Sequence, residues 1–292
     1  MDSQTLNQSP IVDLRSSEQY QRSHIVDSSN FPAEEIADRL HELPMRNRPI
    51  RLLGSEQQIA CTRQFLQQKN YTISSEIVIT EQKILQLKEK GLIESGRDSK
   101  RLWQPAKVIK QFAQLHKNQH ETRGVNSDCQ KQTEVPNMKA LDLACGSGRD
   151  SVYLSTMGWQ MTSVDYSASS LEKTSLLAER LGQNIETINW DIEKRLDELI
   201  ALNWRFDALV IIRYLHRPLL QKLQQMINKQ GFIVYQTFLK GCEKFGSPKN
   251  PRFLLQPGEL ASTFSDFKIH LDEVEYLEDG RPTNRFIAQK IR

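Results

Sequence analysis

The chain has 292 residues, more than the roughly 100–150 residues most common for a single domain, so we expect two domains. Its hydrophobic content of 38%, charged content of 26% and formal net charge of +3 are ordinary for a soluble globular protein, and they do not favour nucleic acid or an anionic membrane as partner. No apolar run approaches the roughly 20 residues that span a bilayer, and the polar N-terminus lacks the apolar region of a secretory signal. The four cysteines match neither a zinc pattern nor a disulfide framework, so we expect reduced thiols in a cytoplasmic protein.

The first 80 residues alternate short apolar strands with helices, which predicts a small parallel sheet. The segment Ala33–Leu43 places its apolar residues at helical spacing after Pro32, and we expect an amphipathic helix there. A further helix passes through Phe65 and Leu66. The expected strands are Ile11–Leu14, Pro49–Leu53 and Ile77–Ile79.

Two segments of different character follow this first part. Glu81–Leu115 is helical and mildly basic, with interruptions at Gly91 and Gly96. His116–Asn137 is polar and shows no apolar periodicity, so we expect a linker or a loop there.

From Ala140 the pattern becomes that of a doubly wound α/β fold, with regular alternation of strands and helices. Asp207–Ile212 is nearly all apolar, as expected for a strand covered on both faces. Lys268–Leu277 and Arg285–Lys290 predict a C-terminal antiparallel hairpin. The other expected strands are Ala140–Ala144, Met161–Val164, Ile185–Asn189 and Phe232–Thr237, and the expected helices begin near Arg149 or span Leu171–Leu181 and Pro218–Asn228.

A glycine-rich turn follows the first of these strands, in the run Asp142-Leu-Ala-Cys-Gly146-Ser-Gly148-Arg-Asp150. Glycines in such a turn let a ligand approach the backbone closely and present the N–H groups of the following helix to it. The run is close to the Gly-x-Gly-x-x-Gly/Ala pattern of nicotinamide and flavin sites. The turn alone therefore leaves an NAD-linked oxidoreductase open.

Acidic residues at the ends of consecutive strands narrow the choice of ligand. Asp165 follows the second strand, where a carboxylate accepts the ribose hydroxyls of either cofactor. Asp191 and Ile192 follow the third strand and suit the amine and the ring of an adenine. The charge of Asp142 would repel a pyrophosphate and attract a ligand that carries an ammonium and a sulfonium. Electrostatics therefore favours S-adenosylmethionine over NAD, while each carboxylate taken singly also has the position of a helix cap or a satisfied strand end.

The run Ala140–Leu154 resembles the class I S-adenosylmethionine-dependent methyltransferases, and especially their tellurite- and thiopurine-methyltransferase branch. The final hairpin agrees with this, because it separates a methyltransferase-type sheet from a plain dinucleotide-binding one. Ala144 departs from the glycine that many members carry, and its methyl group fits if its φ angle is negative. The cofactor residues that the resemblance implies are Asp142, Ala144, Gly146 and Gly148 for the methionine moiety, Asp165 for the ribose, Asp191 and Ile192 for the adenine with Tyr166 packing beside it, and Arg149 in the same motif.

The same branch implies that the loops after Ile212 and Thr237 face the transferred methyl group. Arg213, Tyr214 and His216 are therefore the catalytic candidates on the acceptor side, with His216 or Tyr214 as the base for an oxygen or nitrogen acceptor. His216 is equally well explained as a loop residue before a helix.

Two further features are candidates to cover this site. The Pro-rich segment Gly246–Leu255 has the length of a lid, although a simple connector has the same appearance. Trp103 is a candidate to cover the cofactor from the N-terminal side, or it anchors the linker.

The first 80 residues resemble a rhodanese-like domain, through Val12-Asp-Leu-Arg15, Glu18, His24-Ile25 and Asn30-Phe-Pro32. A sulfurtransferase of that kind needs a cysteine at the start of the loop after the Pro49–Leu53 strand. Gly54 stands there instead, and Cys61 comes later, at a helical position. We expect this domain to be catalytically inactive and to bind a protein partner or the other domain.

These features together predict an α/β protein with two domains. Residues 1–80 would form the rhodanese-like domain, 81–137 a helical segment and linker, and 138–292 a Rossmann-like methyltransferase domain. The expected reaction is in-line methyl transfer from S-adenosylmethionine to a small molecule, which requires no metal. The alternatives left open are an RNA methyltransferase and a non-catalytic S-adenosylmethionine-binding scaffold protein.

Overall fold

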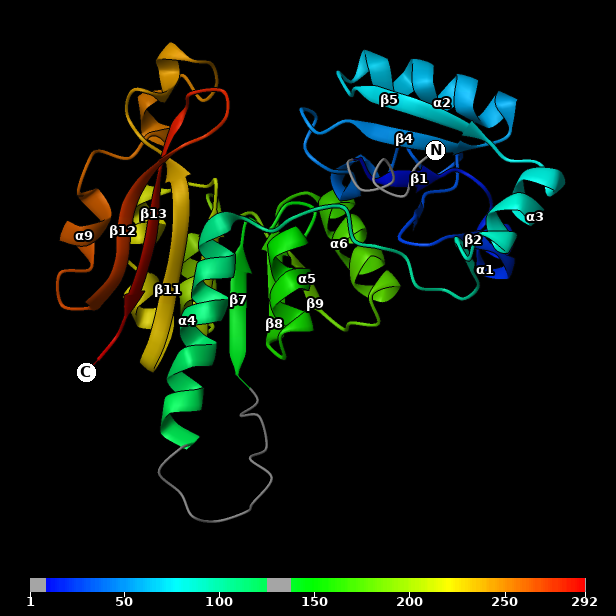
Figure 1. Ribbon diagram of the computed structural model, residues 1–292. Coiled ribbons are helices and arrows are strands. Elements are labelled where there is room, and N and C mark those ends of the chain that lie inside the picture. The colour runs from blue at the N-terminus through cyan, green and yellow to red at the C-terminus, as the bar shows by residue number, and fades with distance from the viewer. Residues whose placement is uncertain (1–8, 125–137, 292) are drawn as a thin grey trace. The chain divides into compact units, whose positions relative to one another are not determined.

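The computed structural model describes residues 9–124 and 138–291 (Figure 1). The chain divides into two compact units, the first unit (Met1–Gln104) and the second unit (Pro105–Arg292). Within the described residues, no helix is both long and apolar enough to cross a membrane.

The first unit is built on a small parallel sheet, as the sequence predicts. Its strands are β1 (Ile11–Asp13), β2 (His24–Ile25), β3 (Ser29–Asn30), β4 (Ile50–Gly54), β5 (Ile73–Val78) and β6 (Ile93–Glu94), and its α-helices are α1 (Ser17–Arg22), α2 (Glu56–Gln68) and α3 (Glu81–Glu89). The parallel sheet has the order β3-β1-β4-β5, while β2 and β6 form a separate antiparallel pair. Helix α2 packs on β4 and β5, and Leu52, Ile59 and Leu66 belong to the core of this unit.

The expected amphipathic helix Ala33–Leu43 is wrong. The segment forms consecutive turns that end in a short 3-10 helix, Leu40–Glu42. The Arg39 N–H still donates to the Glu35 carbonyl at 3.1 Å, as in an α-helix, but the N–H groups of Glu42 and Leu43 donate only three residues back, to Arg39 at 2.9 Å and to Leu40 at 3.3 Å. The α-helical ladder therefore does not continue. The apolar side chains are nevertheless buried in the core of the first unit, because successive turns bury residues at nearly the same spacing as a helix.

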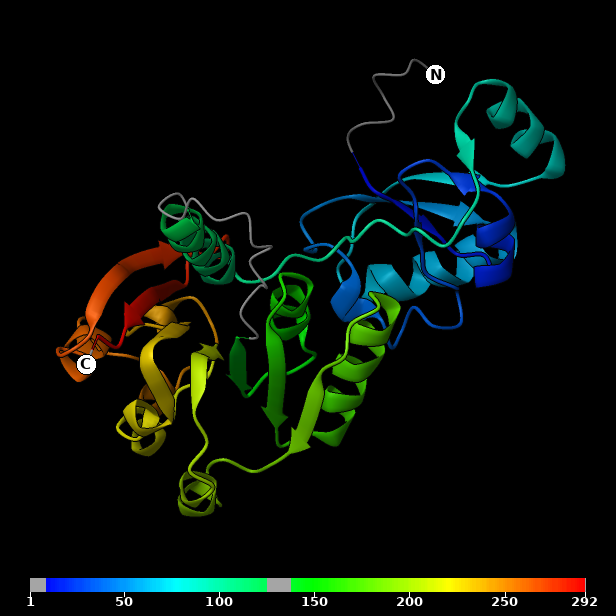
Figure 2. The ribbon, with the colours of Figure 1, turned by 90° about the horizontal axis from the view of Figure 1, so that it is seen from below.

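The second unit is a seven-stranded sheet with helices on both faces (Figure 2). Its strands are β7 (Lys139–Leu143), β8 (Gln160–Asp165), β9 (Glu186–Asn189), β10 (Phe206–Ile212), β11 (Ile227–Phe238), β12 (Lys268–Tyr276) and β13 (Pro282–Gln289), and its α-helices are α4 (Lys107–Gly124), α5 (Arg149–Thr156), α6 (Ala168–Arg180), α7 (Leu196–Ala201), α8 (Arg217–Leu220) and α9 (Glu259–Thr263). Helices α4, α5 and α6 contact the sheet on one face. Residues of α7, α8 and α9 share one apolar cluster with β7 and β10.

The strand order of the second unit, β12-β13-β11-β10-β7-β8-β9, fixes the place of its site. Strands β9, β8, β7, β10 and β11 are parallel, and β13 is antiparallel to both β11 and β12, so the doubly wound sheet and the final hairpin are confirmed. From β7 the chain passes to β8 and β9 on one side and returns to β10 on the other. Ligands of such sheets bind where the order reverses, outside the carboxyl ends of the strands, which here means beyond β7 and β10.

The expected helix Pro218–Asn228 is also wrong. Helix α8 ends at Leu220, the 3-10 helix Leu223–Met226 follows, and β11 already begins at Ile227. Strand pairing is the reason, because Ile227 is in register with Phe206 of β10, and the Asn228 amide donates to Asp207 at 2.8 Å.

The structure places the boundary between the two parts differently from the sequence reading. Helix α3 and strand β6 belong to the first unit, and the expected linker His116–Asn137 is helical as far as Gly124, with 125–137 outside the described residues. The His116 ring packs 4.7 Å from that of Trp159 and 6.0 Å from that of Phe112. This aromatic packing holds α4 in place at the first residue of the expected linker.

Candidate functional site

The turn after β7 has the backbone conformation that a ligand needs for close approach. The φ angles of Gly146 and Gly148 are +56° and +75°. A Cβ atom at Gly146 would meet no atom within 4 Å, so the space beside this residue is open. A Cβ atom at Gly148 would lie 2.4 Å from the Thr174 side chain on α6. Gly148 is thus required for packing, whereas Gly146 leaves its backbone accessible.

Ala144 in this turn contradicts the expectation of a negative φ. Its φ angle is +62°, in the left-handed region that L-residues with a Cβ atom adopt at a cost. The backbone at Ala144 is therefore strained, at a position where glycine would fit without strain.

Asp165, at the end of β8, joins two strand ends. One carboxylate oxygen accepts the Gly146 N–H at 2.8 Å and the other accepts the Ser167 N–H at 2.9 Å. The residue is 6% exposed. Since an ionised carboxylate has about four acceptor positions, two remain for a ligand. This bond places the glycine turn and Asp165 next to each other; their common role in cofactor binding stays a prediction.

Asp142 lies behind the turn, inside β7. Its carboxylate accepts the Ser151 hydroxyl, which in turn accepts the Ser163 hydroxyl at 2.8 Å. Burial, together with the nearby charges of Asp150 and Asp165, raises the pKa of Asp142 to about 8, against the Ser151 hydrogen bond, which lowers it. Its charge is therefore costly in the ligand-free protein, and an approaching cation would favour the ionised form.

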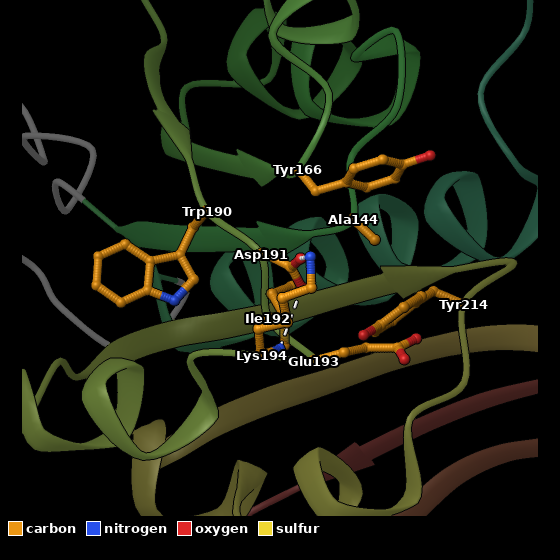
Figure 3. Close-up of a pocket in the computed structure, with 8 residues that line it drawn as sticks. All are labelled: Ala144, Tyr166, Trp190, Asp191, Ile192, Glu193, Lys194 and Tyr214. Atoms are coloured by element: carbon orange, nitrogen blue, oxygen red, sulfur yellow. Dashed lines mark hydrogen bonds and ion pairs between the residues drawn. The ribbon is translucent and has the colours of Figure 1, made fainter.

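A cavity of about 360 Å³ opens beyond β7, β8 and β9 (Figure 3). Four predicted cofactor residues, Ala144, Tyr166, Asp191 and Ile192, line it together with Trp190, Glu193, Lys194 and Tyr214. Figure 3 shows the rings of Tyr166 and Tyr214 on either side of Ala144, with the Trp190 ring beyond Asp191.

Asp191 is already paired within this cavity. Its carboxylate accepts the Lys194 N–H at 3.1 Å, and the Lys194 Nζ lies 3.1 Å from its second oxygen. These contacts with Lys194 lower the pKa of Asp191, so it is ionised at neutral pH. Sequence reasoning missed Lys194 and Trp190 as lining residues, although both are within three positions of Asp191.

A second cavity, of about 490 Å³, lies beyond β10 and β11. Its lining residues are Glu193, Arg213, Tyr214, Leu215, Phe238, Ser247, Pro248, Phe253 and Arg281. Glu193 and Tyr214 line both cavities, so they mark where the two meet. Ser247, Pro248 and Phe253 come from the predicted lid segment Gly246–Leu255.

The three acceptor-side candidates lie differently. Arg213 and Tyr214 line the second cavity, whereas His216, in the loop that enters α8, is not among the described residues that line either cavity. Burial, followed by the charges of Glu193 and Asp191, raises the pKa of Tyr214. The Tyr214 phenol therefore stays protonated at neutral pH and suits a hydrogen-bond donor better than a base.

Arg149 and Trp103, two further candidates from the sequence, are not among the described residues that line either cavity. Arg149 begins α5, and its charge acts on Asp150 and Arg213. Trp103 belongs to the first unit, where it is buried and the Arg101 guanidinium lies 4.8 Å from its ring. Its role as a cover for the cofactor stays a prediction.

The turn after β4 in the first unit is filled by its own side chains. The Ser55 hydroxyl accepts the Gln58 N–H at 3.3 Å, the Gln58 carbonyl oxygen accepts the Ser55 N–H at 3.0 Å, and the Gln58 amide donates to the Leu14 carbonyl at 3.1 Å. Cys61 lies one helical turn or more further on, exposed on α2. Among the cysteines that the structure describes, none lies at this strand end.

Comparison with known proteins adds a family. Residues 108–280 match the family model described as tellurite resistance protein TehB. A probable S-adenosyl-L-methionine-dependent methyltransferase TehB of Haemophilus influenzae (strain 10810) is 32% identical over 32% of this chain and 34% of its own length. An uncharacterized protein of Schizosaccharomyces pombe (strain 972 / ATCC 24843) is 23% identical over 96% of this chain and 93% of its own length, so its match extends over both units. The crystal structure of TehB from Haemophilus influenzae aligns with a TM-score of 0.45 and 21% identity, over 60% of this chain and 62% of that one.

Proposed function

The chain belongs to the TehB family of S-adenosylmethionine-dependent methyltransferases, and we propose that its second unit methylates a small-molecule acceptor by in-line transfer. The observation that carries the proposal is the bond between Asp165 and the N–H of Gly146, beside open space at the point where the strand order reverses.

The residues present fit S-adenosylmethionine. Gly146 leaves room for a ligand at the backbone, and Asp165 retains acceptor positions for ribose hydroxyls. Asp191 and Ile192, with Tyr166 beside them, would hold the adenine in the 360 Å³ cavity. Asp142, with Ala144, Gly148 and Arg149 around the turn, would hold the methionine moiety, and the positive charges of the ligand would favour its ionised form.

The reaction requires little catalytic chemistry from the protein itself. When bound, the cofactor supplies a methyl carbon already activated by a positively charged sulfur, so the chain's own residues need to align the acceptor and exclude water. Tyr214 and Glu193 line both cavities, and the acceptor would meet the methyl group beside them. A soft nucleophile would need no base. For an oxygen or nitrogen acceptor, His216 could serve as the base only if it reached the cavity from the loop that enters α8.

We also propose that the first unit is a rhodanese-like module without sulfurtransferase activity, which binds a protein partner. Gly54 at the strand end and the Ser55–Gln58 contacts in the turn support the lack of activity, because a persulfide anion would need both a thiol and free N–H groups there.

Thermal unfolding with S-adenosylmethionine, S-adenosylhomocysteine and NAD tests the proposed function. We expect the first two to stabilise the protein and Asp165→Asn to weaken their binding by about tenfold or more, the cost of about 1.4 kcal/mol in a charge-assisted contact. Asp207→Asn is the matched control, because Asp207 also accepts a backbone N–H, from Lys139 at 2.9 Å, at the opposite end of the sheet. This control should lose stability and keep cofactor binding.

Three outcomes would contradict the proposal. Stabilisation by NAD alone would favour an oxidoreductase, and stabilisation by S-adenosylmethionine without methyl incorporation into any acceptor would favour the S-adenosylmethionine-binding scaffold protein. Methyl incorporation into RNA and into no small molecule would favour an RNA methyltransferase.

A further inference from the structure

The 490 Å³ cavity combines apolar rings with cations. Phe238 and Phe253 belong to its lining, and Leu215 and Pro248 add apolar surface. Phe238 and Leu215 are buried, at 8% and 2% exposed. Arg213 and Arg281 bring two guanidinium groups to the same space. A ligand bound in this cavity would therefore contact apolar side chains and positively charged groups at the same time.

The charges of this cavity are only partly balanced. Glu193 pairs with Arg252 at 2.6 Å, and Arg281 pairs with Asp279 at 2.8 Å. Arg281 is held further by the Ser247 carbonyl at 2.6 Å and lies 4.8 Å from the centre of the Phe238 ring.

Arg213 differs from these paired groups. Within the described part of the chain its guanidinium has neither a hydrogen bond nor an ion pair. Its φ angle of +58° and the bond from its N–H to the Gln236 carbonyl, at 2.6 Å, fix the direction in which the residue leaves β10. Desolvation and the charges of Arg149 and Arg281 lower its pKa, against Asp150 and Asp279, which raise it. A cation in such surroundings gains from an anionic ligand.

The size of the cavity distinguishes two kinds of anion. One water takes about 30 Å³, so 490 Å³ is far more than a small inorganic oxyanion fills. It lies within the range of about 300–1,000 Å³ that is usual for organic ligands.

We propose that the acceptor is an organic anion with a ring-sized apolar body, whose carboxylate pairs with Arg213 while its body packs against Phe238 and Phe253. A separate nucleophilic atom on that body would form the new bond to the methyl carbon, with S-adenosylhomocysteine as the leaving group. The proposal rests on the proposed function, because it names the acceptor class of that same site. It sets this chain apart from an enzyme for a small inorganic oxyanion.

Calorimetric titration of the full chain saturated with S-adenosylhomocysteine tests this inference. The probes are 3-phenylpropanoate, its neutral amide 3-phenylpropanamide, and tellurite. We expect the carboxylate to bind at least about tenfold more tightly than the amide, as one charge-assisted pair allows. Arg213→Gln should remove this difference and Arg213→Lys should restore part of it, while Phe253→Ala should weaken both organic probes alike.

Arg205→Gln is the control, because Arg205 is exposed at the start of β10, outside both cavity linings, and it should leave all affinities unchanged. Equal binding of acid and amide, binding of tellurite alone, or an unaltered preference in Arg213→Gln would overturn the inference. Failure of S-adenosylhomocysteine to saturate the protein is seen first, in a separate titration, and would count against the proposed function instead.

Discussion

Two strand-to-helix turns, one in each unit, leave a parallel sheet in the same way and differ in what fills them. After β4 the side chains of Ser55 and Gln58 take up the free backbone groups, and Gln58 also reaches the Leu14 carbonyl. After β7 the turn has φ angles of +62°, +56° and +75° at Ala144, Gly146 and Gly148, and open space at Gly146. The first turn is closed by the chain itself, and the second is left accessible.

The difference shows that the fold alone does not determine whether a strand end can bind a ligand. The side chains of the turn decide whether its backbone groups are free to do so. A capping box stabilises the start of α2, and it also occupies the N–H groups that an anion would need. In the second unit, Asp165 takes the Gly146 N–H and keeps further acceptor positions for a ligand.

The largest effect is expected for Gly148→Ala. A methyl group there would lie 2.4 Å from Thr174 at a φ angle of +75°, and we expect the free energy of unfolding to fall by about 3 kcal/mol. Gly54→Ala is the matched change in the closed turn, where the new atom would be 3.1 Å from the flexible Gln58 amide and 3.2 Å from Leu14. It should cost about 1 kcal/mol or less. Urea denaturation measures both, and equal losses would remove the contrast.

The second effect concerns Asp142 and depends on pH. Burial raises the pKa of this carboxyl to about 8, while in the unfolded chain it ionises near its ordinary value of about 4. The folded state thus holds the proton over this window, and stability falls as the pH rises from about 4 to about 8. Asp142→Asn cannot ionise, so it should be more stable than the wild type by about 2 kcal/mol or more at pH 8, with a smaller gain at pH 5.

The same substitution should weaken the cofactor site. If the Asp142 charge serves a cationic ligand, Asp142→Asn should bind S-adenosylmethionine about tenfold less tightly at pH 8, a loss of about 1.4 kcal/mol. A variant that gains stability and keeps its full affinity would show that Asp142 has no part in binding.

The sequence predicts the residues at the strand ends, but it does not predict side chains that reach the site from segments distant in sequence. Asp165 and Gly146 were predictable as neighbours because the carboxyl ends of adjacent parallel strands meet at one edge. Arg281, from the turn before β13, reaches the second cavity only through the packing of the final hairpin, and no local pattern indicates it. Lys194 escaped for the opposite reason, since it is close to Asp191 but has the appearance of a solvated surface lysine.

Secondary structure was predictable where burial and pairing agree. The apolar strand Asp207–Ile212 is covered on both faces and was found almost to the residue, as β10. Ala33–Leu43 and Pro218–Asn228 were predicted as helices because apolar spacing reports which side chains are buried, and turns or 3-10 segments bury the same ones. Whether the α-helical hydrogen bonds continue through such a segment depends on contacts with residues outside it.

The smallest effect on stability, again a gain, is expected for Ala144→Gly. Holding alanine at a φ angle of +62° costs about 1–2 kcal/mol, whereas a glycine adds about 0.4–1 kcal/mol of unfolded-state entropy. The strain is larger, so the variant should be more stable by about 0.5 kcal/mol. Ala201→Gly, at the exposed end of α7, should instead lose about 0.5 kcal/mol. Urea denaturation measures the change in the free energy of unfolding for both Ala→Gly variants. A gain at Ala144 with a loss at Ala201 would show that the backbone of the open turn is strained at Ala144. A loss at both positions would mean that this backbone is relaxed.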